Sequence, residues 1–476
     1  MRKNNIYLGV ITAVASLGGL LFGFDMAVIS GVLPLVEKQF GLSAAQEGWF
    51  VSSALVGCII GVAFSGELSD RFGRKKLLLV AAVLFLLSAL GCALMPSLFW
   101  IIAFRVMGGI GIGIASNVVP LYISEIAPAN IRGRLVTYYQ FALTFGILVA
   151  YLTNAGLLNF SLAQQTASGN NLFDHLFVDE VWRGMFGLGV LPALLFLIGL
   201  MMVPESPRWL IQKGRNNEAE HILAKLSNSA DARRDTELIQ QNLSKEEGSY
   251  KELFAPGMRK PLLIGIFLPL FSQFSGINAI IYYGPSILNN AGISLSNSLL
   301  SQIILGAANM LFTLIAIWKV DTWGRRPLYI VGTAGATIAL FLTGLCFYTG
   351  ATTSIMLLLC VISFLACFAF SIGPLKFVVA SEIFPNRIRG RAMAISIMVM
   401  WIADTIVGQL TPMLLDGLGT AYTFWFFAVF CLIAFFIVYK MLPETKGQSL
   451  EQIEKFFSQK SKLPEEKIQS VKDYSA

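Results

Sequence analysis

The sequence has few charged residues for its length. Of 476 residues, 13% are Asp, Glu, Lys or Arg and 55% are hydrophobic, whereas a soluble domain carries roughly 25% charged residues. This composition excludes a soluble globular protein and predicts a chain that crosses a membrane many times. The net charge of +7 does not indicate a nucleic-acid partner, because the basic residues stand in short runs between apolar stretches, where membrane topology places them.

Residues that bind metals or carry out acid–base catalysis are also scarce. The only histidines, His175 and His221, stand in polar segments, and no Ser/His/Asp set or phosphate-binding loop is recognisable. We therefore expect no catalytic residues, no metal site, no cofactor and no disulfide framework, which disfavours an enzyme. All cysteines fall within apolar runs without metal-ligand spacing; they are Cys58, Cys92, Cys346, Cys360, Cys367 and Cys431.

Long apolar runs make up most of the chain. A bilayer core needs about 20 apolar residues per helix, and twelve stretches satisfy that length, six before Pro204 and six after Pro256. The first continues to about Leu33 without a cleavage site, so we expect a spanning helix rather than a signal peptide. The expected spans are 6–33, 47–68, 77–96, 98–121, 135–158, 184–203, 261–289, 299–320, 328–350, 354–380, 392–415 and 421–442.

The Lys and Arg residues predict which loops share a side of the membrane. RFGRKK at 71–76, IRGR at 131–134, GRR at 324–326 and IRGR at 388–391 would lie on one side with the central polar segment and both termini. Because cytoplasmic loops carry an excess of Lys and Arg, we expect that side to be cytoplasmic.

The central polar segment divides the chain into two halves. We expect a first six-helix half at 1–203, a linker at 204–258, a second half at 259–443 and a cytoplasmic tail at 444–476. Helix-like stretches such as NNEAEHILAKL favour short surface helices in the linker, with a disordered linker as the alternative. The tail begins with an amphipathic stretch, SLEQIEKFF.

Two loop motifs occur twice. SEIAPANIRGR at 124–134 returns as SEIFPNRIRGR at 381–391, and ELSDRFGRKK after the second span is answered by VDTWGRRP after the eighth. Each copy follows the corresponding span of its half, so the halves are predicted to be parallel structural repeats.

These paired loops, together with PESPRWL at 204–210, PETKG at 443–447 and GINAIIYYGP at 276–285, resemble the sugar porter family of the major facilitator superfamily. The resemblance covers nearly the whole chain and includes bacterial xylose, arabinose and galactose:proton symporters and facilitative glucose transporters. It implies an all-α membrane fold of twelve transmembrane helices in two six-helix halves.

The same resemblance implies a secondary active transporter that imports a monosaccharide, a pentose or hexose, with protons by alternating access. Its partners would be a small sugar and the lipid bilayer, with the proton as coupling ion, and we expect a monomer in the cell membrane, the inner membrane of a bacterium. An acidic sugar or polyol as substrate, a facilitative uniporter and a transporter-like sugar sensor stay open as alternatives, although the short tail disfavours the sensor.

The repeated loops each place acids and arginines at the cytoplasmic ends of helices. The family resemblance implies that they act as latches holding the outward-open state, because a few ion pairs are enough to bias two conformations. The alternative is that the arginines are topology signals anchored among headgroups. The expected gate residues are Asp70, Arg71, Arg74, Glu125, Arg132, Arg134, Asp321, Arg325, Arg326, Glu382, Arg389 and Arg391.

Ionisable residues inside the spans are costly and are functional candidates by default. Asp25 in the first span and Arg105 in the fourth could pair within the first half. The position of Asp25 matches the aspartate that bacterial sugar:proton symporters protonate, so the resemblance implies a proton-coupling role for the two residues. A purely structural ion pair is the alternative.

A sugar needs uncharged donors and acceptors and often an aromatic face. Residues that match sugar contacts of the family are Gln140, Gln273, Asn278, Tyr282, Tyr283, Asn309 and Trp401. Gly276 and the pair Gly373-Pro374 are expected to unwind the seventh and tenth spans and act as gating hinges.

Several positions depart from the family pattern. Ser272 and Met400 stand where relatives carry an amide, and Phe377 replaces a tryptophan of the tenth span. Lys376 and Asp404 are additional charges at the expected sugar site. They could neutralise each other, or Lys376 could bind the carboxylate of an acidic sugar or face away from the cavity.

Overall fold

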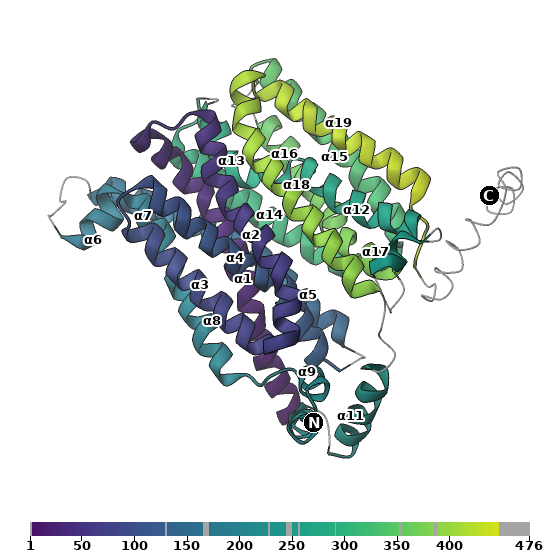
Figure 1. Cartoon of the computed structure of the whole chain (residues 1–476). Coiled ribbons are helices and arrows are strands. Elements are labelled where there is room, and N and C mark those ends of the chain that lie inside the picture. The colour runs from purple at the N-terminus through teal and green to yellow at the C-terminus, as the bar shows by residue number, and fades with distance from the viewer. Residues whose placement is uncertain are drawn as a thin grey trace, which may run out of the picture.

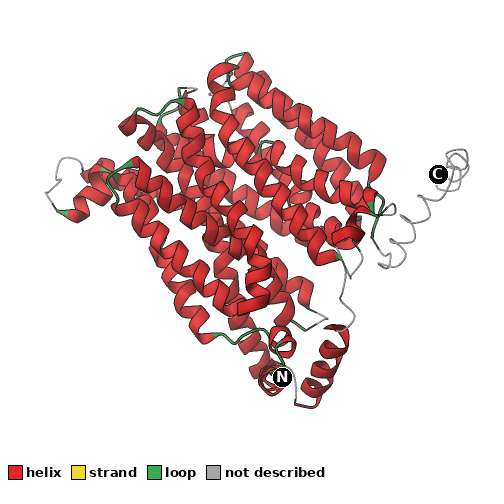
Figure 2. Cartoon of the chain, in the orientation of Figure 1, coloured by secondary structure: helices red, strands yellow, loops and turns green. Residues whose placement is uncertain are grey.

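The computed structural model is helical throughout the part of the chain that it describes, and Figure 2 shows no strand there. The described residues are 2–128, 131–164, 171–226, 229–243, 250–255, 258–290, 292–351, 355–384 and 388–446.

Twelve stretches of the described chain are long and apolar enough to cross a membrane, which confirms the predicted number of spans. The protein is therefore a multi-pass membrane protein. The spans of the first half are α1 (Arg2–Phe40), α2 (Ala44–Phe72), α3 (Arg74–Leu94), α4 (Leu98–Ile126), α5 (Arg132–Gln164) and α7 with α8 (Val181–Gly187, Val190–Met202). Those of the second are α12 with α13 (Arg259–Phe274, Ile277–Asn290), α14 (Leu295–Trp323), α15 (Arg325–Tyr348), α16 with α17 (Ile355–Cys367, Gly373–Ile383), α18 (Arg389–Gly417) and α19 (Thr420–Met441).

Shorter helices lie outside these spans. The linker forms α9 (Pro207–Gln212), α10 (Asn216–Leu226), α11 (Ser229–Leu243) and the short η2 (Tyr250–Phe254), so the expectation of surface helices is confirmed there. Trp209 and Leu210 of α9 pack with Ala219 of α10 in a small core of their own. A short helical element, α6 (Leu172–Asp174) with η1 (His175–Asp179), precedes α7. The amphipathic stretch of the tail lies outside the described residues.

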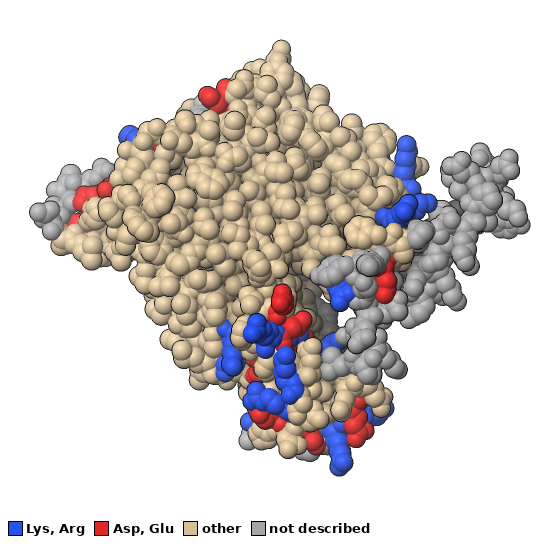
Figure 3. Space-filling model, in the orientation of Figure 1, with Lys and Arg blue, Asp and Glu red and all other residues tan. Residues whose placement is uncertain are grey.

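The two halves stand side by side, purple to blue for the first and teal to yellow for the second in Figure 1. They meet where α2 packs on α18 and where α5 packs on α14. On the face drawn in Figure 3, charged residues gather mainly at the end that carries the linker helices, and a broad band without them covers the middle. That band matches a surface that faces lipid.

The seventh span is broken as predicted. Helix α12 ends at Phe274 and α13 begins at Ile277, and Gly276 between them has φ +82°, which glycine adopts without steric cost. A Cβ on Gly276 would also stand 2.6 Å from the Phe427 ring.

The tenth span differs from the prediction, because Gly373-Pro374 does not unwind it. A π-helical turn, η3 (Phe368–Ile372), joins α16 directly to α17. Proline has no N–H to donate and its ring collides with the preceding turn of a regular α-helix. The wider π-helical turn before Pro374 accommodates the proline and keeps the segment helical.

Close helix crossings in the first half depend on glycine. Gly57 of α2 and Gly109 of α4 face each other, and a Cβ on Gly109 would stand 1.9 Å from the Ala54 carbonyl oxygen. Small residues of this kind let backbones approach within a membrane, where van der Waals packing drives helix association.

Gly109→Ala is expected to lower the free energy of unfolding by about 1–3 kcal/mol, because the helices must separate to admit the methyl group. Reversible denaturation in mixed micelles measures this. Gly66→Ala is the matched control, since a Cβ on Gly66 meets nothing within 4 Å. Equal stability of the two variants would contradict the close crossing.

Candidate functional site

A buried ion network joins three segments of the first half. Arg74 at the start of α3 donates from Nε and Nη2 to the two carboxylate oxygens of Glu125 in α4, each at 2.9 Å. Their side chains are only 6% and 3% exposed. Asp70 Oδ1 lies 2.9 Å from Arg74 Nη1, and the Ser206 hydroxyl donates to Glu125 at 2.6 Å. The network therefore ties the α2–α3 loop, the end of α4 and the start of α9 together.

The second half repeats this construction. Arg325 at the start of α15 donates from Nη2 to Glu382 of α17 at 2.9 Å, and the Thr445 hydroxyl donates to the same carboxylate at 2.6 Å. In both halves an arginine of one repeated loop thus meets an acid of the other, Arg74 with Glu125 and Arg325 with Glu382. Each ion pair lies within its own half, Arg74–Glu125 in the first and Arg325–Glu382 in the second. We call the end of the bundle that holds these two networks the charged end.

Two further glutamates cap spanning helices at the charged end. Glu205 accepts the backbone N–H groups of Arg74 and Lys75 at 3.0 and 3.1 Å. Glu444 accepts those of Arg325 and Arg326 at the same two distances. A carboxylate at a helix N-terminus satisfies free N–H groups and interacts favourably with the helix dipole.

Glycine makes these caps possible. Gly73 and Gly324 precede the two capped helices with φ +105° and +91°, and a Cβ on Gly73 would stand 2.3 Å from Glu205 Oε2. The sequence predicted no role for these two capping residues, although Glu205 lies in the PESPRWL motif and Glu444 in the PETKG motif. The signal that could have found them is the matching Pro-Glu-Ser/Thr sequence after the sixth and twelfth spans.

The remaining predicted gate residues make other contacts or lie outside the description. Arg71 stacks over the Phe72 ring at 5.2 Å, Arg326 donates to the Tyr439 carbonyl at 2.9 Å, and Arg389 donates to the Phe384 carbonyl. Arg391 lies in the first turn of α18. The structure does not describe the side chains of Arg132, Arg134 and Asp321.

Hydrogen bonds join the two halves at the end opposite to the charged end. Gln409 of α18 accepts from the Ser52 hydroxyl at 2.9 Å and donates to the Ala45 carbonyl at 3.0 Å. The Ser296 hydroxyl donates to Asn159 at 2.9 Å. The crossing is tight, because a Cβ on Gly48 would stand 2.4 Å from the Gln409 carbonyl oxygen.

A fourth contact uses a carbonyl that a proline leaves free. Pro285 in α13 has no N–H to donate to the carbonyl of Ile281 one turn earlier, and the Tyr151 hydroxyl of α5 donates to that carbonyl at 3.4 Å. The opposite end of the bundle is thus closed by contacts that sequence reasoning missed. No pattern marks a Ser, Gln or Tyr whose partner lies in the other half of the chain.

Asp25 and Arg105 both lie beside Phe186, but no ion pair within 4 Å joins them in the described chain. The direct pair that the sequence allows is therefore not formed in this structure. Arg105 instead donates from Nε to the Phe50 carbonyl at 2.8 Å and stacks over the Phe50 ring at 5.1 Å. Asp25 lines a space of about 10 Å³ beside Ser88 and Phe186, which is about the size of one water molecule.

A polar cluster occupies the centre of the second half. The Asn278 amide nitrogen donates to Gln273 Oε1 at 2.8 Å and to Asp404 Oδ1 at 2.6 Å. The Tyr282 hydroxyl donates to Asp404 Oδ2 at 3.2 Å, and the Tyr283 hydroxyl donates to the Gly408 carbonyl at 2.6 Å. The break before α13 thus lets its first turns face α18, and most of the predicted sugar contacts of the second half are brought together.

Lys376 and Asp404 do not pair directly. No ion pair within 4 Å joins them in the described chain, and Lys376 donates from Nζ to the Ser272 hydroxyl at 3.0 Å. Asp404 is already engaged by Asn278 and Tyr282. The expectation that the two charges neutralise each other by contact is therefore wrong, and Lys376 is buried rather than extended to the membrane surface.

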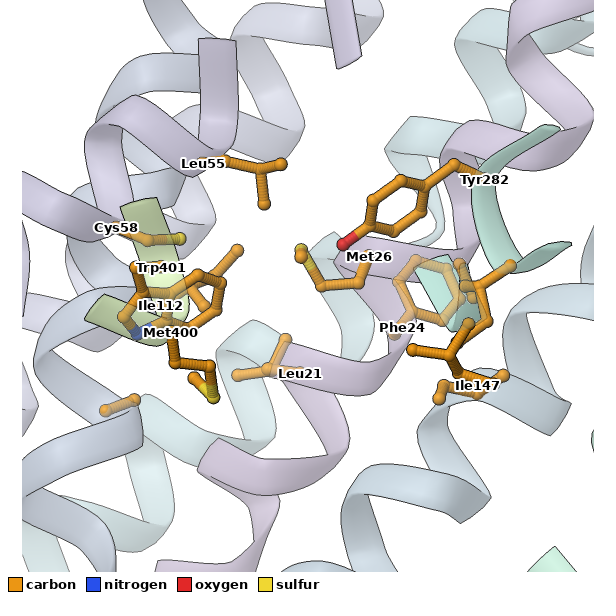
Figure 4. Packing of buried hydrophobic residues seen from close by; sticks show 14 of the residues in the cluster. Leu21, Phe24, Met26, Leu55, Cys58, Ile112, Ile147, Tyr282, Met400 and Trp401 are labelled. Carbon is orange, nitrogen blue, oxygen red and sulfur yellow. The ribbon is translucent and has the colours of Figure 1, made fainter. Parts of the chain in front are cut away.

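Trp401 of α18 is fully buried where the halves meet. Its ring lies 5.4 Å from that of Phe22 in α1, and its indole N–H has no hydrogen-bond partner among the described residues. In the view of Figure 4, Trp401 and Tyr282 stand on either side of Leu21 and Met26.

The other residues that were expected to contact the sugar are half-buried or buried and lie on α5, α17 and α14. Gln140 is half-buried on α5, and Phe377 is half-buried with Lys376 Nζ 5.2 Å from its ring centre. Asn309 is buried on α14.

Solved structures define the class of protein. The proton:xylose symporter XylE bound to 6-bromo-6-deoxy-D-glucose is similar, with a TM-score of 0.79 and 39% identity over 95% of this chain and 100% of that chain. An inward open structure of the Escherichia coli xylose transporter XylE has a TM-score of 0.80 and 38% identity over 94% and 99% of the two chains. The protein therefore has the major facilitator fold, with twelve transmembrane helices in two six-helix halves.

Sequence comparison identifies the family. Residues 11–457 match the family described as "Sugar (and other) transporter", and the chain belongs to it. An arabinose-proton symporter of Bacillus subtilis (strain 168) is 41% identical over 449 residues, 94% of each chain. A D-xylose-proton symporter of Escherichia coli (strain K12) is 39% identical over 496 residues, 97% of this chain and 98% of the relative.

Glu125→Gln is expected to lower the free energy of unfolding by about 3 kcal/mol, because it leaves the buried Arg74 charge without its main partner. The control is Glu218→Gln, which breaks the Arg215–Glu218 pair whose side chains are 50% and 56% exposed. Water screens an exposed pair of this kind, so its loss is expected to change stability little. Denaturation in mixed micelles compares them, and equal losses would show that burial of the network does not govern its strength.

Proposed function

We propose that the protein imports a neutral monosaccharide, a pentose or hexose, together with protons by alternating access. The observation that carries the substrate class is the buried indole N–H of Trp401, which has no partner among the described residues and lies where the two halves meet. A ring with a free donor, on the same helix as Asp404 of the polar cluster, suits the apolar face and hydroxyl groups of a sugar. The relatives named above, symporters of arabinose and xylose, support this substrate class.

Alternating access has a structural basis in the difference between the two ends. The described contacts between halves close the end opposite to the charged end, whereas the two ion networks each hold segments of one half. Opening the closed end therefore requires loss of a few neutral hydrogen bonds, while each half keeps its ion network and moves as a unit. We propose that the predicted gate residues at the charged end form contacts between halves in the outward-open state.

Proton coupling is assigned to Asp25, with Arg105 beside it. A charged carboxylate at membrane depth without an ion pair is costly, and binding of a proton removes that charge. The small space beside Asp25 and Ser88 can hold one water molecule, which offers a route for the proton. Arg105 of α4 is held to α2 by its hydrogen bond to the Phe50 carbonyl. Protonation of Asp25 therefore changes the electrostatic interaction between α1 and the joined pair α2 and α4.

The second half favours a neutral substrate over an acidic one. Lys376 supplies a positive charge beside Ser272, but Asp404 places a negative charge beside Asn278 in the polar cluster of the same half. The carboxylate of a uronate would meet the Asp404 charge as well as the Lys376 charge. We therefore assign both residues to the sugar site without assigning an acidic sugar.

The arrangement of the chain in the membrane is part of the same proposal. Both termini and the charged end face the cytoplasm, and the protein acts as a monomer in a bacterial inner membrane. The division into halves at 1–203 and 259–443, with a linker at 204–258 and a tail at 444–476, follows the positions of the linker helices α9 to α11 and the last span. The excess of Lys and Arg at the charged end supports this orientation.

Asp25→Asn is expected to abolish accumulation of xylose against its gradient in proteoliposomes, because an amide cannot bind and release the coupling proton. Counterflow of xylose should stay within about threefold of the wild type, since neither substrate contacts nor gates change. Asp416→Asn, at the exposed outer end of α18, is the control. Undiminished accumulation by the Asp25→Asn protein would exclude this residue as the coupling site.

Trp401→Phe is expected to weaken xylose binding about tenfold, because it removes one buried hydrogen-bond donor and keeps an aromatic ring. Titration calorimetry of the purified protein measures the affinity. Trp425→Phe is the control, since that indole donates to the Phe341 carbonyl away from the meeting point of the halves. An unchanged affinity in the Trp401→Phe protein would mean that the indole N–H does not contact the sugar.

A further inference from the structure

A second cavity lies inside the second half, away from the polar cluster. It has a volume of about 220 Å³, is partly open, and is lined by α13, α14 and α16, with Phe347 of α15 and Phe424 of α19 completing its wall. Almost all of its lining is apolar, for example Ile280, Leu305 and Leu357. Apolar cavities of ~150 Å³ in proteins stay dry and bind hydrophobic molecules as large as benzene, so this one can accept a short alkyl chain.

One side chain in the wall has unmet hydrogen-bonding capacity. Gln302 of α14 is 0% exposed, and neither Nε2 nor Oε1 has a hydrogen-bond partner among the described residues. The other polar residue of the lining, Ser301, donates its hydroxyl to the Asn297 carbonyl. Each unsatisfied buried group is unfavourable, so Gln302 marks the point where a guest with a polar group would be held.

The position of the Gln302 amide depends on Gly284 of α13. A Cβ on Gly284 would stand 1.8 Å from Gln302 Nε2, so the amide lies directly against the α13 backbone. No charged residue of the described chain lines the cavity, so its wall suits an uncharged guest. Ile355 at the start of α16 is 77% exposed and lies at the rim, on a spanning segment that faces lipid.

We propose that this cavity binds an uncharged single-chain alcohol that enters from the bilayer. The Gln302 amide is covered in this structure, so the guest binds when the amide turns toward the cavity. One hydroxyl, which both donates and accepts, then meets Oε1 with its O–H and Nε2 with its lone pairs. The alkyl chain then packs against the aliphatic and aromatic wall. The combination of one neutral donor–acceptor pair with apolar walls selects an alcohol over an alkane and over a charged lipid.

Occupation of the cavity bears on the movement of α13. Ile280, Gly284 and Ile287 face the cavity, whereas Asn278 and Tyr282 lie on the opposite side of the same helix, at the polar cluster, as helical spacing requires. A guest behind α13 fills the space into which α13 would shift when its contacts with α5 and α18 are released. Bound alcohol therefore inhibits transport; this consequence, unlike binding itself, rests on the proposed function.

Photolabelling of the full chain in lipid nanodiscs with a diazirine derivative of octanol tests the binding site. Labels are expected on the cavity-lining residues of α13, α14 and α16, and octanol should compete better than octane. Val361→Phe, which fills the cavity from α16, should abolish these labels. Gln302→Met preserves shape and removes both polar atoms, and should weaken competition by octanol about fivefold to tenfold. Leu311→Phe, on the exposed face of α14, is the control and should label as the wild type does.

Labelling that is unchanged in Val361→Phe, or equal competition by octanol and octane, would overturn the proposal. Melting curves check that each variant is folded. Xylose counterflow is then measured with octanol present, and inhibition is expected in the wild type but not in Val361→Phe. Absence of counterflow in the wild type without octanol contradicts the proposed function alone, because the labelling result stands independently of transport.

Discussion

Burial of charge at the charged end is the constraint on which the rest of the architecture depends. A guanidinium or carboxylate removed from water is unfavourable by several kcal/mol unless its partners satisfy it fully. Arg74 and Glu125 satisfy each other with two hydrogen bonds, and Ser69 and Ser206 take up further capacity. Because loss of any member leaves a buried charge, the segments that carry them cannot separate. Each ion network therefore forms a rigid corner, and relative motion must occur between the halves.

The two ion networks have the same construction but differ in their exposure to water. The Arg325 and Glu382 side chains are 13% and 23% exposed, so water screens the second network more strongly than the first. The second half also contains the break at Gly276 and the π-helical turn before Gly373, both of which interrupt regular α-helical hydrogen bonding. Local rearrangement during transport is thus easier in the second half. The interrupted segments there carry functional candidates, since α13 contributes to the polar cluster and α17 carries Lys376.

Sequence reasoning succeeded where the signal is local or duplicated. Apolar length predicted the spans, the duplicated acids and arginines marked the residues of both ion networks without specifying their pairing, and glycine predicted the break before α13. It failed where the outcome depends on side-chain direction. Lys376 and Asp404 are on neighbouring helices, yet Ser272 and Asn278 are their partners. Likewise nothing in the sequence around Gln409 marks it as a contact between halves, because its partner Ser52 belongs to a helix more than 350 positions away.

Asp404 changes what the polar cluster demands of a sugar. The Asn278 amide nitrogen gives its hydrogens to Gln273 and Asp404, so an incoming hydroxyl finds no free N–H there. Asp404 thus fastens α13 to α18 through Asn278 and Tyr282. A sugar that binds Asn278 must displace this carboxylate contact, which loosens α13 from α18.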